Sequence, residues 1–245
     1  MSMDATRATR LSDVLARQGR LEARPRLPVM ESPKRGTFSL GQGGQRDGLV
    51  HVPLEYRAAP PTPLVMMLHG AGGHAHHSLR LLQEIADAEG FILVVPESRG
   101  PTWDVIRGDY GPDVTFIDQA LAWVFAHYAV DPARIAIGGF SDGASYALSL
   151  GIANGDLFTH VLAFSPGFAA PVEQHGEPRL FVSHGIQDAV LPITACSRRL
   201  VPRLQRAGYD VRYHEFDGPH TIPPEIAREA AEWFKSTPQL QLPPR

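Results

Sequence analysis

The sequence predicts one α/β domain with a mostly parallel central sheet covered by helices on both faces. Three observations lead to this fold class. Short continuous apolar runs, typical of strands buried on both faces, alternate with longer segments of helical periodicity. The chain has 245 residues, a length that one α/β domain commonly occupies. Its composition, with 43% hydrophobic and 20% charged residues, is that of a globular rather than a disordered protein.

The first 35 residues differ in composition from the rest. They end in a Pro-rich run at residues 25–28 and carry arginines among small residues, at positions Arg7, Arg10, Arg17, Arg20, Arg24 and Arg26. The pattern favours one or two amphipathic helical turns within residues 11–21, limited by Gly19. We interpret residues 1–35 as a solvated, partly ordered extension. Contact of its basic side chains with a membrane or a partner is the alternative.

The main domain is expected to span residues 36–236. A Gly-rich turn at residues 41–44 separates two strand-like segments and predicts a hairpin at its start. Apolar runs then predict strands at residues 64–68, 91–95, 134–138, 160–164, 179–183 and 211–216. Periodic segments predict helices at residues 79–88, 114–128, 144–153, 194–206 and 224–234. The Pro-rich end, residues 237–245, is interpreted as a frayed tail.

Charge and cysteine content narrow the class of partner. The formal net charge is −3, so no overall positive field favours nucleic acid or an anionic membrane. No apolar run approaches the ~20 residues of a membrane span, and the first residues lack the apolar core of a secretory signal. The one cysteine, Cys196, cannot form an internal disulfide. We expect a cytoplasmic protein that binds small molecules, without nucleic acid or stable membrane insertion; its oligomeric state stays open.

A nucleophilic serine is indicated where an apolar strand runs into a helix. Residues 139–143 form a Gly-x-Ser-x-Gly turn with Ser141 at its centre, after an apolar run and before a helical segment. A serine there adopts a strained backbone, and the two glycines let strand and helix approach without a Cβ collision. The hydroxyl then lies at a helix N-terminus, which favours negative charge. This context predicts Ser141 as a nucleophile rather than part of an ordinary tight turn.

Two later strand ends supply a carboxylate and an imidazole. A serine hydroxyl needs a base at neutral pH, and the base needs a carboxylate to hold its tautomer. Asp188 follows the apolar segment 179–183, and His220 follows the last predicted strand. The order Ser, Asp, His is that of α/β-hydrolases and differs from those of chymotrypsin-like and subtilisin-like enzymes. The sequence therefore predicts a triad of Ser141, Asp188 and His220 at one edge of the sheet.

An oxyanion hole requires two N–H donors aimed at the developing negative charge. Residues 69–73, His-Gly-Ala-Gly-Gly, form a loop with few side chains directly after a central predicted strand. We expect the backbone N–H of Ala71 to be one donor and that of Asp142, next to the nucleophile, to be the other. The side chain of Asp142 is then expected only to cap the helix.

Taken together, four segments resemble the bacterial phospholipase/carboxylesterase family of α/β-hydrolases: residues 69–73, 139–143, 184–188 and 218–220. That family is related to acyl-protein thioesterases and, more distantly, to polyhydroxybutyrate-depolymerase-like and feruloyl-type esterases. The resemblance spans about residues 37–234. It implies an α/β-hydrolase fold with little or no lid, no metal, and esters of modest size as substrates. One departure concerns Asp142, because thioesterase-like relatives usually carry Gln there.

Other histidines compete less well for these roles. His74, His76 and His77 suggest a metal site, but no matching carboxylate or cysteine spacing completes it, so no metal and no cofactor are expected. His69 and His184 each lie near the end of a predicted strand and are interpreted as hydrogen-bonded structural residues.

Three further polar residues are assigned to the fold. Asp217 lies three residues from His220 and is interpreted as a turn residue rather than the triad acid. Ser165 half-matches the serine turn, but Pro166 would remove the N–H that an oxyanion hole needs. Asp113, just before a predicted helix, is interpreted as its N-cap.

These residues predict a serine carboxylesterase that hydrolyses small to medium carboxylic esters through an acyl-enzyme. The same triad also supports a thioesterase or a lysophospholipase. A catalytically silent binding protein on the same scaffold is the alternative from another class, because a fold alone does not establish an activity.

Overall fold

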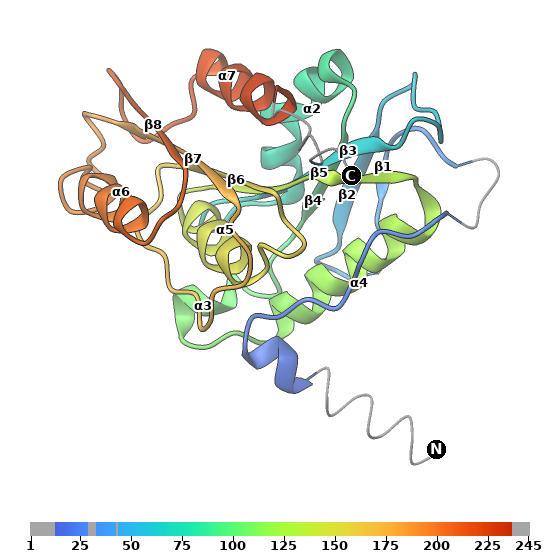
Figure 1. The fold of residues 1–245 in the computed structure, drawn as a ribbon, viewed down its shortest axis with the longest axis horizontal. Helices are drawn as coiled ribbons and strands as arrows, with labels where there is room; N and C mark the ends of the chain where they lie inside the picture. The colour runs from blue at the N-terminus through green and yellow to red at the C-terminus, as the bar shows by residue number, and fades with distance from the viewer. Residues whose placement is uncertain (1–12, 29–32, 43, 237–245) are drawn as a thin grey trace, which may run out of the picture.

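The computed structural model describes residues 13–28, 33–42 and 44–236. In this part of the chain a central sheet lies between two layers of helices (Figure 1). Helices α2 and α7 pack on one face, and α4, α5 and α6 pack on the other. The predicted fold class is therefore confirmed.

Eight strands form one sheet in the order β1-β2-β4-β3-β5-β6-β7-β8. Strands β3 to β8 run parallel, whereas β2 pairs antiparallel with both β1 and β4. The central strands are continuous apolar runs because helices bury both of their faces. The strands are β1 Gly36–Ser39, β2 Gly48–Val52, β3 Thr62–Leu68, β4 Ile92–Pro96, β5 Val130–Phe140, β6 His160–Phe164, β7 Arg179–Gly185 and β8 Val211–Phe216.

The helices bury one apolar layer on each face of the sheet. Helix α2 ends at Gly90, which adopts φ 70° and so takes the left-handed conformation that glycine favours at a helix end. No helix in the described part of the chain is long and apolar enough to cross a membrane. The helices are α2 Ala75–Glu89, α3 Asp104–Arg107, α4 Pro112–His127, α5 Asp142–Ala153, α6 Ser197–Arg206 and α7 Pro224–Lys235.

Parallel strands bring their carboxyl ends to one edge of the sheet. The loops that follow β3, β5, β7 and β8 therefore open at the same edge. These loops carry the oxyanion segment, the serine, the carboxylate and the imidazole that the sequence predicts. The topology thus gathers residues that are far apart in the sequence.

Three elements differ most from the sequence prediction. Helix α2 begins at Ala75, four residues before its predicted start. Strand β5 begins at Val130, four residues before its predicted start, because its first half contains polar, partly exposed residues that hide the strand pattern. Helix α3 is only four residues long and was not predicted. A single helical turn has too few residues to show a period.

The prediction that Asp113 caps a helix is wrong. Helix α4 begins at Pro112 with Gly111 at the cap position, so Asp113 is the second helical residue. Its carboxylate is buried and accepts the backbone N–H groups of Arg99 and Asp104. Burial raises its pKa to about 6. Asp113 thus organises the loop before α4 from inside the protein.

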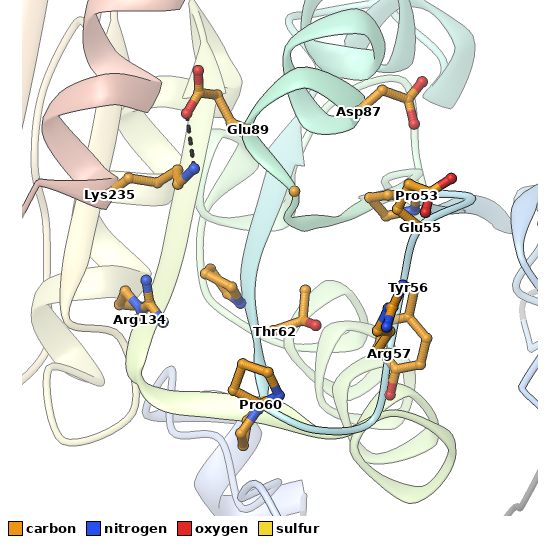
Figure 2. Close-up of a pocket in the computed structure, with 13 residues that line it drawn as sticks. Pro53, Glu55, Tyr56, Arg57, Pro60, Thr62, Asp87, Glu89, Arg134 and Lys235 are labelled. Atoms are coloured by element: carbon orange, nitrogen blue, oxygen red, sulfur yellow. Dashed lines mark hydrogen bonds and ion pairs between the residues drawn. The ribbon is translucent and has the colours of Figure 1, made fainter.

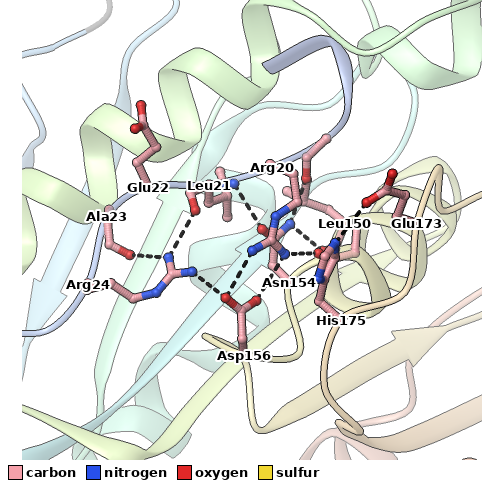
Figure 3. A network of polar contacts seen from close by, with 12 residues as sticks. Arg20, Leu21, Glu22, Ala23, Arg24, Leu150, Asn154, Asp156, Glu173 and His175 are labelled. Carbon is pink, nitrogen blue, oxygen red and sulfur yellow. Dashed lines mark hydrogen bonds and ion pairs between the residues drawn. The ribbon is translucent and has the colours of Figure 1, made fainter. Parts of the chain in front are cut away.

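Residues 13–28, which we call the N-terminal strap, pack against the main domain. This differs from the solvated extension that composition predicts. Residues 13–17 form a helical turn, and the strap buries Ala16, Leu21 and Ala23 in the core on the α4 and α5 side. Asn154, just after α5, donates from its amide to the carbonyl of Gly19 and accepts the N–H of Leu21 (Figure 3). Residues 1–12, 29–32, 43 and 237–245 lie outside the described residues.

Two arginines of the strap bind a carboxylate of the main domain. Arg20 and Arg24 both pair with Asp156, at 3.0 Å and 2.5 Å (Figure 3). Arg20 also donates to the carbonyl oxygen of Ala153. Burial opposes ionisation of Asp156, but the two guanidinium groups outweigh it and lower its pKa to about 2. These two arginines hold the strap in place through contacts within the chain.

Candidate active site

Ser141 lies at the sharp turn between β5 and α5. Its backbone adopts φ 58° and ψ −121°, a conformation that is rare outside glycine and common at functional sites. A Cβ on Gly139 would lie 2.2 Å from the carbonyl oxygen of Gly143, and one on Gly143 would lie 2.5 Å from that of His69. Both positions therefore require glycine, because a side chain at either would collide with the backbone.

Neighbouring elements fix the serine turn on two sides. The N–H of Ser141 donates to the carbonyl of Phe164 on β6 at 3.0 Å. On the other side, a Cβ on Gly70 would lie 3.3 Å from the Cβ of Ser141, so the loop after β3 packs against the turn. The predicted oxyanion loop is thus adjacent to the predicted nucleophile.

Asp188 and His220 are in direct contact at the same edge. His220 Nδ1 lies 2.5 Å from Asp188 Oδ2. A carboxylate oxygen only accepts hydrogen bonds, so Nδ1 carries the proton and Nε2 is the free acceptor of the neutral ring. The ring of Phe140, the residue before Ser141, packs on His220 with 4.6 Å between centroids. No hydrogen bond joins Ser141 to His220 among the described residues, and such bonds often tighten only when substrate binds.

The second oxygen of Asp188 is held by backbone donors. Oδ1 accepts the N–H of Val190 at 2.9 Å and that of Leu191 at 2.8 Å. Burial favours the neutral carboxyl group, but the donors from His220, Leu191 and Val190 outweigh it, and the pKa of Asp188 lies below its usual value. The carboxylate is therefore ionised and oriented at neutral pH.

The two predicted oxyanion donors border the serine turn. Asp142 is the first residue of α5, where an N–H has no acceptor within the helix. In the described loops, the N–H of Ala71 donates to no backbone carbonyl, whereas those of the two following glycines do. Both N–H groups therefore stay the predicted donors to an oxyanion.

His69 holds the loop after β3 through hydrogen bonds on both of its ring nitrogens. Its Nδ1 lies 2.8 Å from the carbonyl oxygen of Gly70, and its Nε2 accepts the N–H of Ser98 at 3.0 Å. Trp103 donates its indole N–H to the carbonyl of His69 at 2.8 Å. Burial lowers the pKa of His69, which keeps the ring neutral. These contacts are consistent with a structural role for His69.

The side chain of Asp142 has a role that the sequence did not reveal. Ser141 holds the N-cap position and Asp142 is the first helical residue, so the expectation that Asp142 caps α5 is wrong. The Oδ2 of Asp142 instead accepts the hydroxyl of Thr102 at 2.7 Å. Thr102 lies in the loop after β4, 40 residues away, and no local pattern marks it. This bond ties that loop to the residue that follows the nucleophile.

The remaining candidates lie outside this arrangement. Asp217 accepts a hydrogen bond from Gln187 and does not contact the imidazole through any hydrogen bond of the described residues. His74 and His77 face each other at 5.9 Å between ring centroids, and no group of metal-ligating side chains is found in the described chain. Ser165 directly follows β6 and is fully buried, with φ 53°. Among the described non-glycine residues, Ser165 and Ser141 have positive φ. The sequence around Ser165 did not predict this conformation.

Two pockets are lined by residues outside the site. The first, of about 320 Å³, lies at the amino ends of the parallel strands beside the 2.9 Å ion pair of Lys235 and Glu89 (Figure 2). The second, of about 500 Å³, lies between the N-terminal strap and the start of α4. Neither pocket is lined by Ser141, Asp188 or His220. The candidate site is therefore assigned from the contacts of these three residues and not from a cavity.

The parallel sheet carries a strained serine after one strand, and a paired carboxylate and imidazole after two later strands. This arrangement defines the class of α/β-hydrolases. Within that class, residues 115–237 match the Phospholipase/Carboxylesterase family. The chain belongs to this family, as the resemblance of its motifs implied.

Curated relatives of the chain are esterases. It is 31% identical over 159 residues to a bifunctional acetylxylan esterase/xylanase of Neocallimastix patriciarum, over 61% of this chain and 22% of that protein. It is 30% identical over 156 residues to a probable feruloyl esterase C of Aspergillus oryzae, over 60% of this chain and 56% of that protein. The chain thus spans about half or less of the length of these relatives.

Solved structures share the fold at low sequence identity. Esterase PE8 superposes with a TM-score of 0.63 at 24% identity, over 77% of this chain and 97% of that chain. A ferulic acid esterase of Anaeromyces mucronatus in complex with ferulic acid gives 0.62 at 19% identity, over 88% and 94%. These similarities show the α/β-hydrolase fold.

Proposed function

We propose that this chain is a serine carboxylesterase that hydrolyses small to medium carboxylic esters through an acyl-enzyme on Ser141. The observation that carries the proposal is the 2.5 Å contact between His220 Nδ1 and Asp188 beside the strained serine turn. That contact supplies a base of defined tautomer next to a hydroxyl at a helix N-terminus.

The proposed reaction has two steps. His220 Nε2 takes the proton of Ser141 as its oxygen attacks the ester carbonyl, and Asp188 stabilises the resulting imidazolium. The N–H groups of Ala71 and Asp142 bind the oxyanion, and His220 then protonates the leaving alcohol. In the second step His220 removes a proton from water as its oxygen attacks the acyl carbon; the bond from that carbon to Ser141 then breaks, the carboxylic acid leaves, and His220 returns the proton to Ser141. No cofactor takes part.

The relatives suggest which esters to test first. One is named an acetylxylan esterase and several are named feruloyl esterases, which favours acetyl and feruloyl esters of oxygen. Thioester or lysophospholipid hydrolysis by the same triad is the alternative. Asp142 stands where the thioesterase-like proteins usually carry Gln, so oxygen esters come first. The proposal includes a cytoplasmic location, which the single cysteine supports because it leaves no internal disulfide.

Initial rates with p-nitrophenyl acetate, butyrate and octanoate and with methyl ferulate test this function. Intact mass after treatment with a fluorophosphonate reports the nucleophile. We expect turnover and one label in the wild-type protein and neither in Ser141→Ala. Ser165→Ala is the matched control, because Ser165 is the other serine at positive φ, and it should keep both signals.

The pattern of results separates the alternatives. Labelling without ester turnover moves the search to thioesters and lysophospholipids. Folded wild-type protein with neither signal contradicts the triad and favours a binding protein on a hydrolase scaffold.

A further inference from the structure

A second histidine contacts the carboxylate of Asp188. His184 lies at the end of β7, and its side chain is fully buried. Its Nε2 lies 3.2 Å from Asp188 Oδ2, the same oxygen that His220 Nδ1 approaches at 2.5 Å. It also lies 2.8 Å from the carbonyl oxygen of Leu191. Two imidazoles therefore share one carboxylate oxygen.

The contacts of His184 define where its proton lies. The two oxygens near Nε2 are both acceptors, so Nε2 carries the proton. In the neutral ring Nδ1 is then an acceptor, and the buried hydroxyl of Ser197 donates to it at 2.7 Å. Burial lowers the pKa of His184, although the contacts with Leu191 and Asp188 oppose this effect. His184 is therefore a neutral donor to Asp188.

Asp188 is the charged group that His184 contacts most directly, because the other titratable groups near it are paired or buried. On β8, Glu215 stands opposite His184 in register, and its carboxylate is paired with Arg198 of α6 at 2.7 Å. Cys196, just before α6, is buried, and burial raises the pKa of its thiol. A neutral His184 leaves the full negative charge of Asp188 for the imidazolium of His220.

We propose that His184 is a positioning residue of the triad, whose Nε2–H orients the shared oxygen of Asp188 and ties the 185–191 loop to β7 through Leu191. This inference rests on the proposed function, since it assigns a role within the same site. A hydrogen bond to a carboxylate stabilises its charge, so removing this donor makes Asp188 a stronger partner for protonated His220. The pKa of His220 should then rise while catalysis slows, because the carboxylate is less well oriented.

Two substitutions and one control test the proposal. His184→Phe keeps a ring but removes the donor, and His184→Gln keeps an N–H near the position of Nε2. His160→Gln is the matched control, because His160 is also buried in the sheet but lies at the opposite, amino end of β6. The pKa of His220 is measured by nitrogen-15 NMR on the resting protein, and the pH dependence of kcat/KM is measured with p-nitrophenyl butyrate.

The expected result combines two changes. In His184→Phe the pKa of His220 rises by about 0.5–1 unit, and kcat falls about 10- to 100-fold, by analogy with the loss of a hydrogen-bond partner behind a metal ligand. His184→Gln gives smaller changes in the same directions, and His160→Gln moves neither quantity. A lost fold would show in the NMR spectrum of the His184→Phe variant, and His184→Gln then decides.

Failure of this inference differs from failure of the proposed function. An unchanged or lowered pKa of His220 in folded variants overturns the role of His184, even where activity falls. Wild-type protein without ester turnover and without fluorophosphonate labelling overturns the proposed function instead. The NMR comparison needs no activity and still decides whether His184 acts on the pair of Asp188 and His220.

Discussion

Replacing Asp188 with asparagine tests the triad because the structure dictates how the amide must lie. Oδ1 of Asp188 accepts N–H groups from Val190 at 2.9 Å and from Leu191 at 2.8 Å. In Asp188→Asn the amide oxygen is expected to take this place, because the NH2 group then opposes one donor, His184 Nε2–H, instead of two backbone N–H groups. This orientation turns the NH2 group towards His220 Nδ1. That nitrogen can then only accept, so the imidazole proton moves to Nε2.

In that tautomer Nε2 cannot take the proton of Ser141, and no carboxylate stabilises the imidazolium. The opposite amide orientation sets the NH2 group against the two backbone donors, leaving each unsatisfied at about 1–3 kcal/mol. The wrong tautomer therefore prevails. We expect kcat to fall on the order of 10⁴-fold, which corresponds to about 5 kcal/mol of lost transition-state stabilisation.

Initial rates with p-nitrophenyl butyrate measure this loss, and circular dichroism confirms that the variant is folded. Asp217→Asn is the matched control. Asp217 lies three residues from His220 and accepts a hydrogen bond from Gln187, but it is not the triad acid in our proposal. A loss below about tenfold in Asp188→Asn, or an equal loss in Asp217→Asn, refutes the reasoning.

Three further outcomes are expected. Burial lowers the pKa of His160 to about 4, so the buried neutral ring costs no stability above about pH 6.5. Below that pH the free energy of unfolding falls, by up to about 3 kcal/mol as the pH drops to 4. Urea unfolding at several pH values measures this fall, and a His160→Gln variant with the same pH dependence as the wild type argues against it. Asn154→Ala removes the acceptor of the Leu21 N–H and the donor to the carbonyl of Gly19. Hydrogen exchange at the Leu21 amide, followed by mass spectrometry, should therefore quicken about tenfold or more, and unchanged exchange contradicts the docking of the strap. Gly143→Ala places a Cβ 2.5 Å from the carbonyl oxygen of His69 and should abolish ester turnover; a folded and fully active variant would show that the turn tolerates a side chain.

The features that could be predicted from sequence are those that neighbouring residues decide. Strand β6, His160–Phe164, was predicted at both ends because it is an uninterrupted apolar run buried on both faces. The turn at Ser141 was predicted because its two glycines lie two residues before and two residues after the serine, within one local segment. The contact of Asp188 with His220 followed from topology, since parallel strands bring their ends to one edge.

The features that escaped prediction depend on residues far apart in the chain. Thr102 binds Asp142 across 40 residues, and nothing in either segment alone indicates the pair. Arg20 and Arg24 of the N-terminal strap were interpreted as part of a solvated charge run because their partner, Asp156, lies more than 130 residues later. Composition reports the average environment of a segment, whereas docking depends on one carboxylate and one amide in the right place.

The N-terminal strap has a consequence for how the chain matures. Leu21 is synthesised 133 residues before Asn154, which binds it. At 5–20 residues per second, a ribosome needs roughly 7–27 s to make that intervening stretch. Throughout this time the apolar side of the strap has no native surface to cover it. The earliest described segment can therefore dock only after α5 and Asn154 have been made, although it is synthesised before every strand of the sheet.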